Sequence, residues 1–355
     1  MTAKRLFNKC VLRPEDVQPT RDDFEVAGVF NPGAVEADGQ VILLVRVAER
    51  PKERRKGFTG LPRWDPGQGP VVDWLPDDEI EVLDPRVVCL KQSGALRLTF
   101  VSHIRVFRSR DGRCVEAMGG ARFEPETRYE TYGVEDPRVA CLDGVFYITY
   151  VAVSEHGAAT ALASTTDFKQ FTRHGVIFYP ENKDVVLFSE KVDGQYMALH
   201  RPNPSMHFSA PAIWLGRSPD LIHWGQHEAI HSGASTWESG RIGAGAPPLK
   251  TNRGWLEIYH GQTNPARPGS VGTYCAGLLL LEAENPGRVA GKSTSPILVP
   301  ETDFELGGSV PGVVFPTGVV QRDDRLLVYY GAADTFTGLV ELSTSELLAI
   351  VSDDT

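Results

Sequence analysis

The feature that most limits how this chain can fold is a unit that recurs about every 50 to 70 residues. Each unit has a polar or proline-containing bend, a short strand, a tight turn with Gly or Asp, and an apolar strand. The turns lie near residues 39, 94, 144, 194, 254 and 324, and the apolar runs are 41–45, 96–101, 145–151, 195–200, 255–260 and 325–330. Repeated hairpins at this spacing predict an all-β chain built from four-stranded propeller blades. Six units allow five or six blades, and a blade shared by the first and last units favours five.

A second repeated element supports this prediction. S-T-T-D-F-K-Q-F at 164–171 and S-P-D-L-I-H-W at 218–224 each place an aromatic residue four positions after an aspartate. Such an element suits a turn between outer strands whose aromatic side chain wedges between blades. No Ser/Gly linker divides the chain, so we expect one catalytic propeller domain over 1–355. The longest irregular insert, 51–70, predicts a surface loop after the first blade, and such loops often line a site.

Composition excludes several classes of protein. The formal net charge of −10 argues against a broad surface that neutralises nucleic-acid phosphates, although a small basic pocket is compatible with it. The five cysteines are scattered and show no metal-ligand spacing, so we expect free thiols and no metal site. The sequence has no signal-peptide pattern and no apolar run of membrane-spanning length. These observations predict a cytoplasmic protein that does not contact a membrane.

Polar residues gather at the bends and at the strand ends. In a propeller the inner strands converge on the axis, so these residues are candidates for one central site. The candidates are Asn31, Arg46, Arg50, Asp84, His103, Glu135, Asp136, Arg138, Glu190, Lys191, His200, Arg201, Lys250, His260 and Asp334.

Each candidate also has a structural interpretation. Asp-Pro commonly opens a turn, and the D-P-R at 84–86 repeats the D-P-R at 136–138, so these letters alone do not identify a catalytic acid. Glu135 distinguishes the second copy. His200 and His260 end apolar strands, where core histidines are usual.

The basic residues are more informative as a group. Alone, Arg217 or Lys250 is typical of a solvated turn. Arg201, Lys250 and His260, however, fall at equivalent places in adjacent repeats, so they are expected to cluster. Arg, Lys and His together suit a small dianion such as phosphate, and an acid facing them suggests displacement at a glycosidic carbon by phosphate. No P-loop, dinucleotide fingerprint or serine-hydrolase elbow is present in the sequence.

Seven segments, in order along the chain, resemble one known family. They are N-P-G-A (31–34), V-E-D-P-R-V (134–139), S-E-K-V-D-G-Q-Y-M-A-L-H-R-P (189–202), S-P-D-L-I-H-W-G (218–225), G-A-G-A-P-P-L-K-T-N-R-G-W-L-E-I-Y-H-G (243–261), V-V-F-P-T-G-V-V (313–320) and Y-Y-G-A-A-D-T (329–335). One segment is weak evidence, whereas the ordered set is specific. The chain thus resembles glycoside hydrolase family 130, the β-mannoside phosphorylases and β-1,2-mannosidases.

The resemblance implies a five-bladed β-propeller and an inverting reaction that yields α-mannose 1-phosphate. It implies that Asp136 is the catalytic acid, acting through the 3-hydroxyl of the mannoside while phosphate attacks the opposite face of the anomeric carbon. The phosphate-binding residues it implies are Arg201, Arg217, Lys250, His260 and Tyr274. The implied substrate-binding residues are Asn31, Arg46, Arg50, Glu135 and Asp334.

The basic set favours phosphorolysis over the hydrolysis of the β-1,2-mannosidases, and a non-catalytic carbohydrate-binding propeller is the third alternative. The expected substrate is a β-1,2-manno-oligosaccharide or a β-1,4-mannosyl-glucose or GlcNAc type of mannoside. Inorganic phosphate is the expected co-substrate, with no other cofactor. The sequence leaves open the second sugar, the length of the oligosaccharide and whether the protein is a homo-oligomer.

Overall fold

The structure is a computed structural model that describes residues 2–203, 210–233, 236–265, 267 and 270–353. Over these residues, α-helix is confined to α1 (Asp303–Leu306) and α2 (Thr344–Asp353), and 3-10 helix to four three-residue turns. The prediction of an all-β chain is confirmed. None of the helices in these ranges has the length and apolar character needed to cross a membrane. All five cysteines are free thiols, as predicted.

Most strands form antiparallel groups of four. The first group, in spatial order, is β2 (Phe24–Ala37), β3 (Gln40–Pro51), β9 (Val101–Ser109) and β10 (Glu116–Phe123). The second is β11 (Gly133–Leu142), β12 (Val145–Ser154), β13 (Gly157–Thr165) and β14 (Thr172–Phe178). A single parallel bridge between Gly133 and Ser102 joins these two groups into one eight-stranded sheet.

The remaining chain repeats the arrangement. The third group is β15 (Asn182–Leu187), β16 (Tyr196–Pro202), β17 (Ala212–Ser218) and β18 (Gly225–Ser232). The fourth contains β19 (Arg241–Gly243) and β20 (Leu249–Thr251), both paired with β21 (Gly254–Gln262), followed by β22 (Tyr274–Leu281) and β23 (Val289–Lys292).

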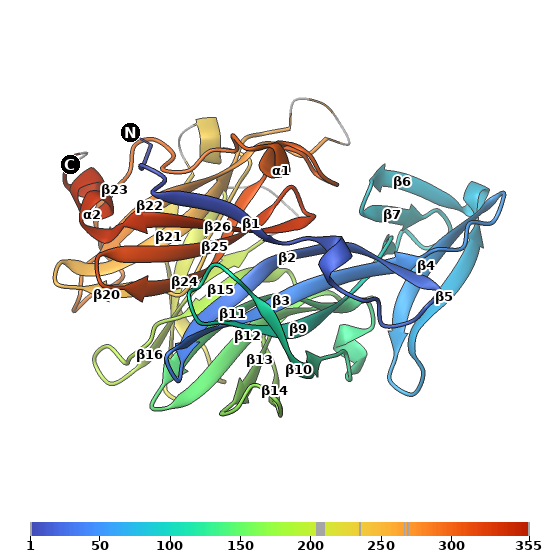
Figure 1. Cartoon of the computed structure of the whole chain (residues 1–355), viewed down its shortest axis with the longest axis horizontal. Helices are drawn as coiled ribbons and strands as arrows, with labels where there is room; N and C mark the ends of the chain where they lie inside the picture. The colour runs from blue at the N-terminus through green and yellow to red at the C-terminus, as the bar shows by residue number, and fades with distance from the viewer. Residues whose placement is uncertain (1, 204–209, 234–235, 266, 268–269, 354–355) are drawn as a thin grey trace.

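The last group closes the chain on itself. It consists of β24 (Val314–Arg322), β25 (Arg325–Ala332), β26 (Phe336–Ser343) and the N-terminal strand β1 (Phe7–Leu12). Because β1 pairs with β26, for example through Phe7 and Glu341, the two ends of the chain lie close together (Figure 1). The last group therefore combines strands from both ends of the chain, whereas the first and last repeat units, 31–45 and 315–330, lie in different groups.

Five further strands form an arm that projects from these groups at the right of Figure 1. β4 (Phe58–Asp65) pairs with β5 (Gly69–Pro76), and β6 (Ile80–Asp84), β7 (Val87–Leu90) and β8 (Leu96–Leu98) form a separate small sheet. Two predictions are corrected here. The insert 51–70 is largely hairpin rather than loop, and the apolar run 96–101 is divided between β8 and β9. The repeat unit that begins at 84 therefore belongs to the arm.

Local turn chemistry explains much of the repeat. Asp-Gly pairs close the β2–β3 and β11–β12 hairpins and the turn before β16, at 38–39, 143–144 and 193–194, and all six residues have positive φ between 49° and 79°. Glycine adopts this region without strain and aspartate tolerates it better than most residues. The chain can therefore reverse within two residues at each of these positions.

A buried glutamate–tyrosine pair recurs in three groups. The hydroxyl of Tyr150 donates to Glu130 at 2.7 Å, and that of Tyr330 donates to Glu305 at 2.6 Å. In the fourth group Tyr259 donates to Glu238 at 2.8 Å. Each glutamate lies in a short helix before the group's inner strand, so the pair fastens the entry of the chain to a central strand.

The predicted aromatic wedges are confirmed. Phe171, in the turn between β13 and β14, packs edge-on against Phe123 of the first group with ring centroids 5.2 Å apart. Trp224, between β17 and β18, stacks on Phe178 of the second group at 5.5 Å. Each ring thus fills the space between consecutive groups, where apolar packing holds neighbouring sheets together.

Candidate functional site

A cavity of about 540 Å³ lies where the groups meet. Each of the five groups of strands contributes to its lining, and so does the arm. The cavity brings together most of the predicted site residues: Asn31, Arg46, Arg50, Glu135, Asp136, Arg201, His260, Tyr274 and Asp334.

Backbone bulges aim polar side chains into this cavity. The pairing of β2 with β3 shifts register between Phe30 and Gly33, and that of β11 with β12 shifts between Glu135 and Arg138. Asn31 and Asp136, within these bulges, have φ of +50° and +49°. A bulge redirects a side chain that a regular strand would point along its face, and such features gather beside functional sites. The N-P-G and D-P-R bends therefore position side chains as well as starting strands.

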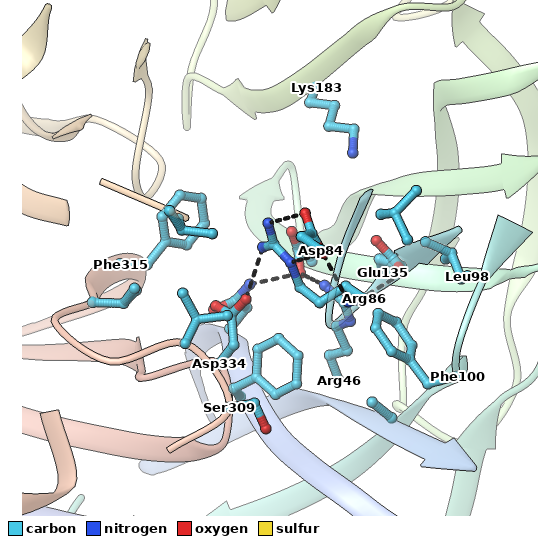
Figure 2. A pocket seen from close by; sticks show the side chains of 18 of the residues that line it. Arg46, Asp84, Arg86, Leu98, Phe100, Glu135, Lys183, Ser309, Phe315 and Asp334 are labelled. Atoms are coloured by element: carbon cyan, nitrogen blue, oxygen red, sulfur yellow. Dashed lines mark hydrogen bonds and ion pairs between the residues drawn. The ribbon is translucent and has the colours of Figure 1, made fainter. Parts of the chain in front are cut away.

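Two adjacent carboxylates share one arginine at the centre of the site. Arg46 donates from Nη2 to Glu135 at 2.6 Å and from Nη1 to Asp136 at 2.9 Å. Asn31 donates to the same Asp136 oxygen at 2.8 Å. The Arg46 guanidinium lies over the ring of Phe30, 4.6 Å from its centroid. Figure 2 shows Arg46 and Glu135 close together in the cavity.

The neighbourhood separates the pKa values of these carboxylates. Burial raises the pKa of Glu135, and the adjacent charge of Asp136 raises it further, against the effect of Arg46. Burial also raises the pKa of Asp136, but Arg46, Arg138 and the hydrogen bond from Asn31 outweigh it and lower the value. Asp136 is thus the more acidic member of the pair. Two carboxylates with divergent pKa values are typical of acid–base sites.

A third carboxylate, Asp184, contacts Arg201 and His260, which form a basic wall of the cavity. It lies in a third bulge, at the start of β15, with φ of +54°. Its Oδ2 accepts a hydrogen bond from Nε of Arg201 at 2.7 Å and lies 3.4 Å from Nε2 of His260. Burial raises the pKa of Asp184, but Arg201, His260 and Arg138 lower it well below the usual range. Asp184 is therefore a fixed anion that holds Arg201 and His260 at the cavity.

Two further basic side chains complete this wall. Lys183 and Arg241 both line the cavity, and within the described ranges neither forms a salt bridge. Burial lowers the pKa of His260 to about 3, so this ring is neutral near pH 7. Burial raises the pKa of Tyr274, despite Arg241 and Arg201 nearby, which keeps its hydroxyl protonated. The wall thus offers unneutralised cations and neutral hydrogen-bonding groups, which suits a small oxyanion.

The structure separates two predicted phosphate ligands from the cavity. Arg217 lies on β17, the third strand of its group, and its guanidinium pairs with Glu228 on β18 at 2.5 Å. Lys250 pairs with Glu190, and both side chains are about half exposed. Lys250 is opposite Trp255 at one end of β21, whereas His260 is near the other end. Equivalent places in the repeat therefore did not mean equivalent positions relative to the cavity.

Several other candidate site residues lie outside the cavity, and two of them contact buried polar side chains. His103 lies 3.0 Å from buried Glu49, and His200 contacts His227 and Asn182. Neither histidine lines the cavity, and nor do Glu190 and Lys191.

Sequence reasoning missed Lys183, Asp184 and Arg241. A usable signal exists for the first two, because N-K-D-V-V-L at 182–187 has the same polar-then-apolar form as E-D-P-R-V-A at 135–140. It lacks the proline that marks the other bends. Arg241 begins a three-residue strand, and no local pattern marks it.

The arm also reaches the cavity. Arg86 donates from Nη1 to Asp334 at 3.0 Å and from Nη2 to Asp84 at 3.2 Å. Asp334 follows β25 with φ of +48°, so this contact connects the arm to the last group (Figure 2). The D-P-R bend at 84–86, which could be purely structural from sequence, thus contributes an arginine to the site.

Comparison with known proteins gives a consistent family. The β-1,2-mannobiose phosphorylase of Listeria innocua is 38% identical to this chain over 98% of both proteins. A 1,2-β-oligomannan phosphorylase of Thermoanaerobacter is 31% identical over 97% of this chain and 98% of its own length. The solved structure of the Listeria innocua enzyme with β-1,2-mannobiose matches this fold with a TM-score of 0.89, at 36% identity over 97% of each chain.

The family model described as β-1,4-mannooligosaccharide phosphorylase matches residues 77–353. This range includes the acidic pair, the basic wall and the arm sheet β6–β8. The match covers well over half of the chain and agrees with the near full-length relatives. The chain belongs to glycoside hydrolase family 130.

Proposed function

We propose that this protein is an inverting β-mannoside phosphorylase that cleaves a β-linked mannoside with inorganic phosphate and releases α-mannose 1-phosphate. One observation carries the proposal: a single cavity holds the Glu135–Asp136 pair on Arg46 and, on another wall, two cations without a carboxylate partner among the described residues. A hydrolase needs a base for water, whereas this wall suits an anionic nucleophile. The named activities of the relatives support the same reaction.

In this proposal Asp136 is the general acid. A phosphate oxygen forms a bond to the anomeric carbon while the bond to the leaving oxygen breaks, and a proton passes from Asp136 through the mannose 3-hydroxyl to that oxygen. Arg46, Arg138 and Asn31 together lower the pKa of Asp136. A bound sugar removes water and a phosphate adds negative charge, and both effects raise the pKa of a carboxyl group. Ligand binding thus favours the protonated acid.

The other residues bind the two substrates. Asn31, Arg46, Arg50, Glu135 and Asp334 are proposed to contact the transferred mannose. We propose that phosphate is held by Lys183, Arg201, Arg241, His260 and Tyr274, all of which line the cavity. Lys183 and Arg241 replace Arg217 and Lys250 of the sequence-based set. No further cofactor is needed in this scheme.

We also propose that the five groups of strands are the blades of one five-bladed propeller, forming a single catalytic domain over 1–355. The pairing of β1 with β26 and contributions to the cavity from every group support this arrangement. A cytoplasmic location is proposed as well, and the free cysteines support it.

The experiment is incubation with β-1,2-mannobiose with and without phosphate, followed by ³¹P NMR and by assay of free mannose. We expect α-mannose 1-phosphate and one equivalent of mannose, both strictly dependent on phosphate. Release of mannose at the same rate without phosphate would identify a β-1,2-mannosidase instead. A binding-only protein would turn over neither way.

A further inference from the structure

Three of the five proposed phosphate ligands lie close together in the fourth group of strands. Arg241 of β19 and Tyr274 of β22 are both paired with Gln262 of β21. His260 lies two positions earlier on β21. The other two proposed ligands are on β15 and β16 of the third group: Lys183 and Arg201. The basic wall is therefore divided between two groups, and its geometry depends on how the fourth group is held against the third.

The turn that leads into β19 packs tightly on the fourth group. This turn is the short 3-10 helix η4 (Thr236–Glu238). A Cβ on Gly261 would lie 2.7 Å from the indole of Trp237, so a larger residue there would collide with the ring. The indole also lies against the ring of Tyr259, with centroids 5.5 Å apart, and both rings belong to an apolar core shared by the third and fourth groups. Because Gly261 directly follows His260, the turn packs immediately beside the basic wall.

One buried carboxylate joins this turn to both groups. Oε2 of Glu238 accepts a hydrogen bond from the hydroxyl of Tyr259 at 2.8 Å and lies 3.2 Å from Nε2 of His231. A carboxylate accepts, so Nε2 of His231 donates. Tyr259 belongs to β21 of the fourth group, whereas His231 belongs to β18 of the third, and all three side chains are buried. The hydrogen bond from His231 therefore connects the third group to the turn that precedes Arg241.

The glutamates at the equivalent turns of two other groups also contact a base. Nε of Arg173 lies 3.3 Å from Glu130, and Nη1 of Arg5 lies 2.6 Å from Glu305. Arg173 is on β14 of the same group as its glutamate, and Arg5 lies just before β1 of its own group. His231 differs from both, because it reaches its glutamate from a neighbouring group. The contact made by His231 thus acts between groups, whereas the two arginines act within one.

We propose that His231 is a positioning residue for phosphate, which holds Glu238 and thereby keeps Arg241 and His260 in place relative to the cations of the third group. The proposal deepens the phosphorolysis proposed above and rests on it. His231 does not line the cavity, so its effect on phosphate passes through Glu238. The residues proposed to contact mannose belong to the first, second and last groups. We therefore expect the effect of His231 to fall on phosphate and not on the sugar.

The first test measures initial rates with phosphate and β-1,2-mannobiose varied in turn. His231→Phe keeps a ring beside Tyr259, whose centroid lies 5.2 Å from that of His231, but removes the donor. We expect the KM for phosphate to rise about fivefold, the effect of losing one buried hydrogen bond, while kcat and the KM for mannobiose change less than about twofold. His231→Gln, whose amide can donate to Glu238, should recover most of the loss.

Arg5→Met is the matched control. It removes the base from Glu305 in the last group, which contributes none of the proposed phosphate ligands. Its KM for phosphate should stay within about twofold of that of the unmodified protein. Three results would overturn the inference: no rise in the KM for phosphate in His231→Phe, an equal rise in Arg5→Met, or an equal rise in both KM values of His231→Phe.

A second measurement needs no turnover. Calorimetric titration with inorganic phosphate in the absence of sugar should show weaker binding to His231→Phe and near-normal binding to His231→Gln. If this ranking holds but the unmodified protein releases mannose without phosphate, the proposed phosphorolysis fails and the role of His231 stands. If the unmodified protein cleaves mannobiose only with phosphate and His231→Phe has unchanged phosphate affinity, the role of His231 fails and phosphorolysis stands.

Discussion

Nη1 of Arg138 donates a hydrogen bond of 2.8 Å to the main-chain carbonyl of Asp136. The same guanidinium donates from Nε to the carbonyl of Gly245 and lies 3.8 Å from Asp184. Arg138 is completely buried, so it connects the bulge that carries the proposed acid with the anion that holds the basic wall. Arg138 therefore holds Asp136 and Asp184 in position relative to each other, although it does not line the cavity itself.

Replacing this arginine should destabilise the fold. Arg138→Met keeps much of the side-chain volume but removes the charge near Asp184 and two donors. We expect a loss of about 3–5 kcal/mol in the free energy of unfolding, because a buried charge loses a partner. Urea denaturation followed by tryptophan fluorescence measures it. Arg108→Met, at an exposed pair with Glu116, is the control, and a loss no larger than that of the control would contradict the prediction.

Replacing the proposed acid should abolish turnover and spare the fold. Asp136→Asn keeps the shape of the side chain and cannot deliver a proton, so we expect kcat to fall about 10²–10⁴-fold. Far-UV circular dichroism should be unchanged. Asp84→Asn is an informative comparison, because it alters the same kind of D-P-R bend in the arm. We expect it to reduce kcat far less, and an equal reduction would argue against a special role for Asp136.

The proposed phosphate set makes opposite predictions for four basic residues. Lys183→Ala and Arg241→Ala should each raise the KM for phosphate about tenfold or more, because each removes a charged donor from the cavity. Arg217→Ala and Lys250→Ala should change it less than about twofold. Initial rates at fixed mannobiose and varied phosphate separate the two outcomes. The reverse ranking would restore the assignment based on sequence.

Stability should fall in acid partly because of a histidine outside the cavity. Burial and the neighbouring His227 lower the pKa of His200 from 6.5 to about 3. Below pH 6.5 the unfolded chain binds a proton that the folded protein excludes, so stability is lost as the pH falls toward 3. The contribution approaches about 1.4 kcal/mol per pH unit for one proton.

Urea denaturation at pH 7, 6 and 5 measures this loss. His200→Gln should flatten the decline between pH 6 and 5, whereas His223→Gln, at an exposed side chain, should leave it unchanged. Parallel declines for the two variants would contradict the prediction. Part of the decline will persist in both variants, because the pKa of buried His260 is also lowered to about 3.

The sequence predicted turns and strands well where their conformation depends on neighbouring residues in the chain. The Asp-Gly turns at 143–144 and 193–194 and the apolar strands that follow them are set by backbone preference and alternating burial. The prediction that each repeat unit forms part of a four-stranded group failed in the arm. There residues 84–86 have the same D-P-R sequence as the bend at 136–138 but lie in a separate small sheet. Identical short motifs can serve both purposes, because a bend specifies a change of direction and not the partner strand.

The sequence alone therefore determined the all-β class, the repeat, the family and the acidic pair at 135–136, since each depends on neighbouring residues or on ordered motifs. Only the tertiary structure decided which cations face the acid. Lys183, Arg241 and Arg86 are far apart in the chain and come from a bulge, a short strand and the arm, yet all line one cavity. Lys250 lies on a strand paired with that of His260 but at its other end, against Glu190. Whether a residue reaches the cavity depends on how the sheets pack against one another, and no local sequence pattern encodes it.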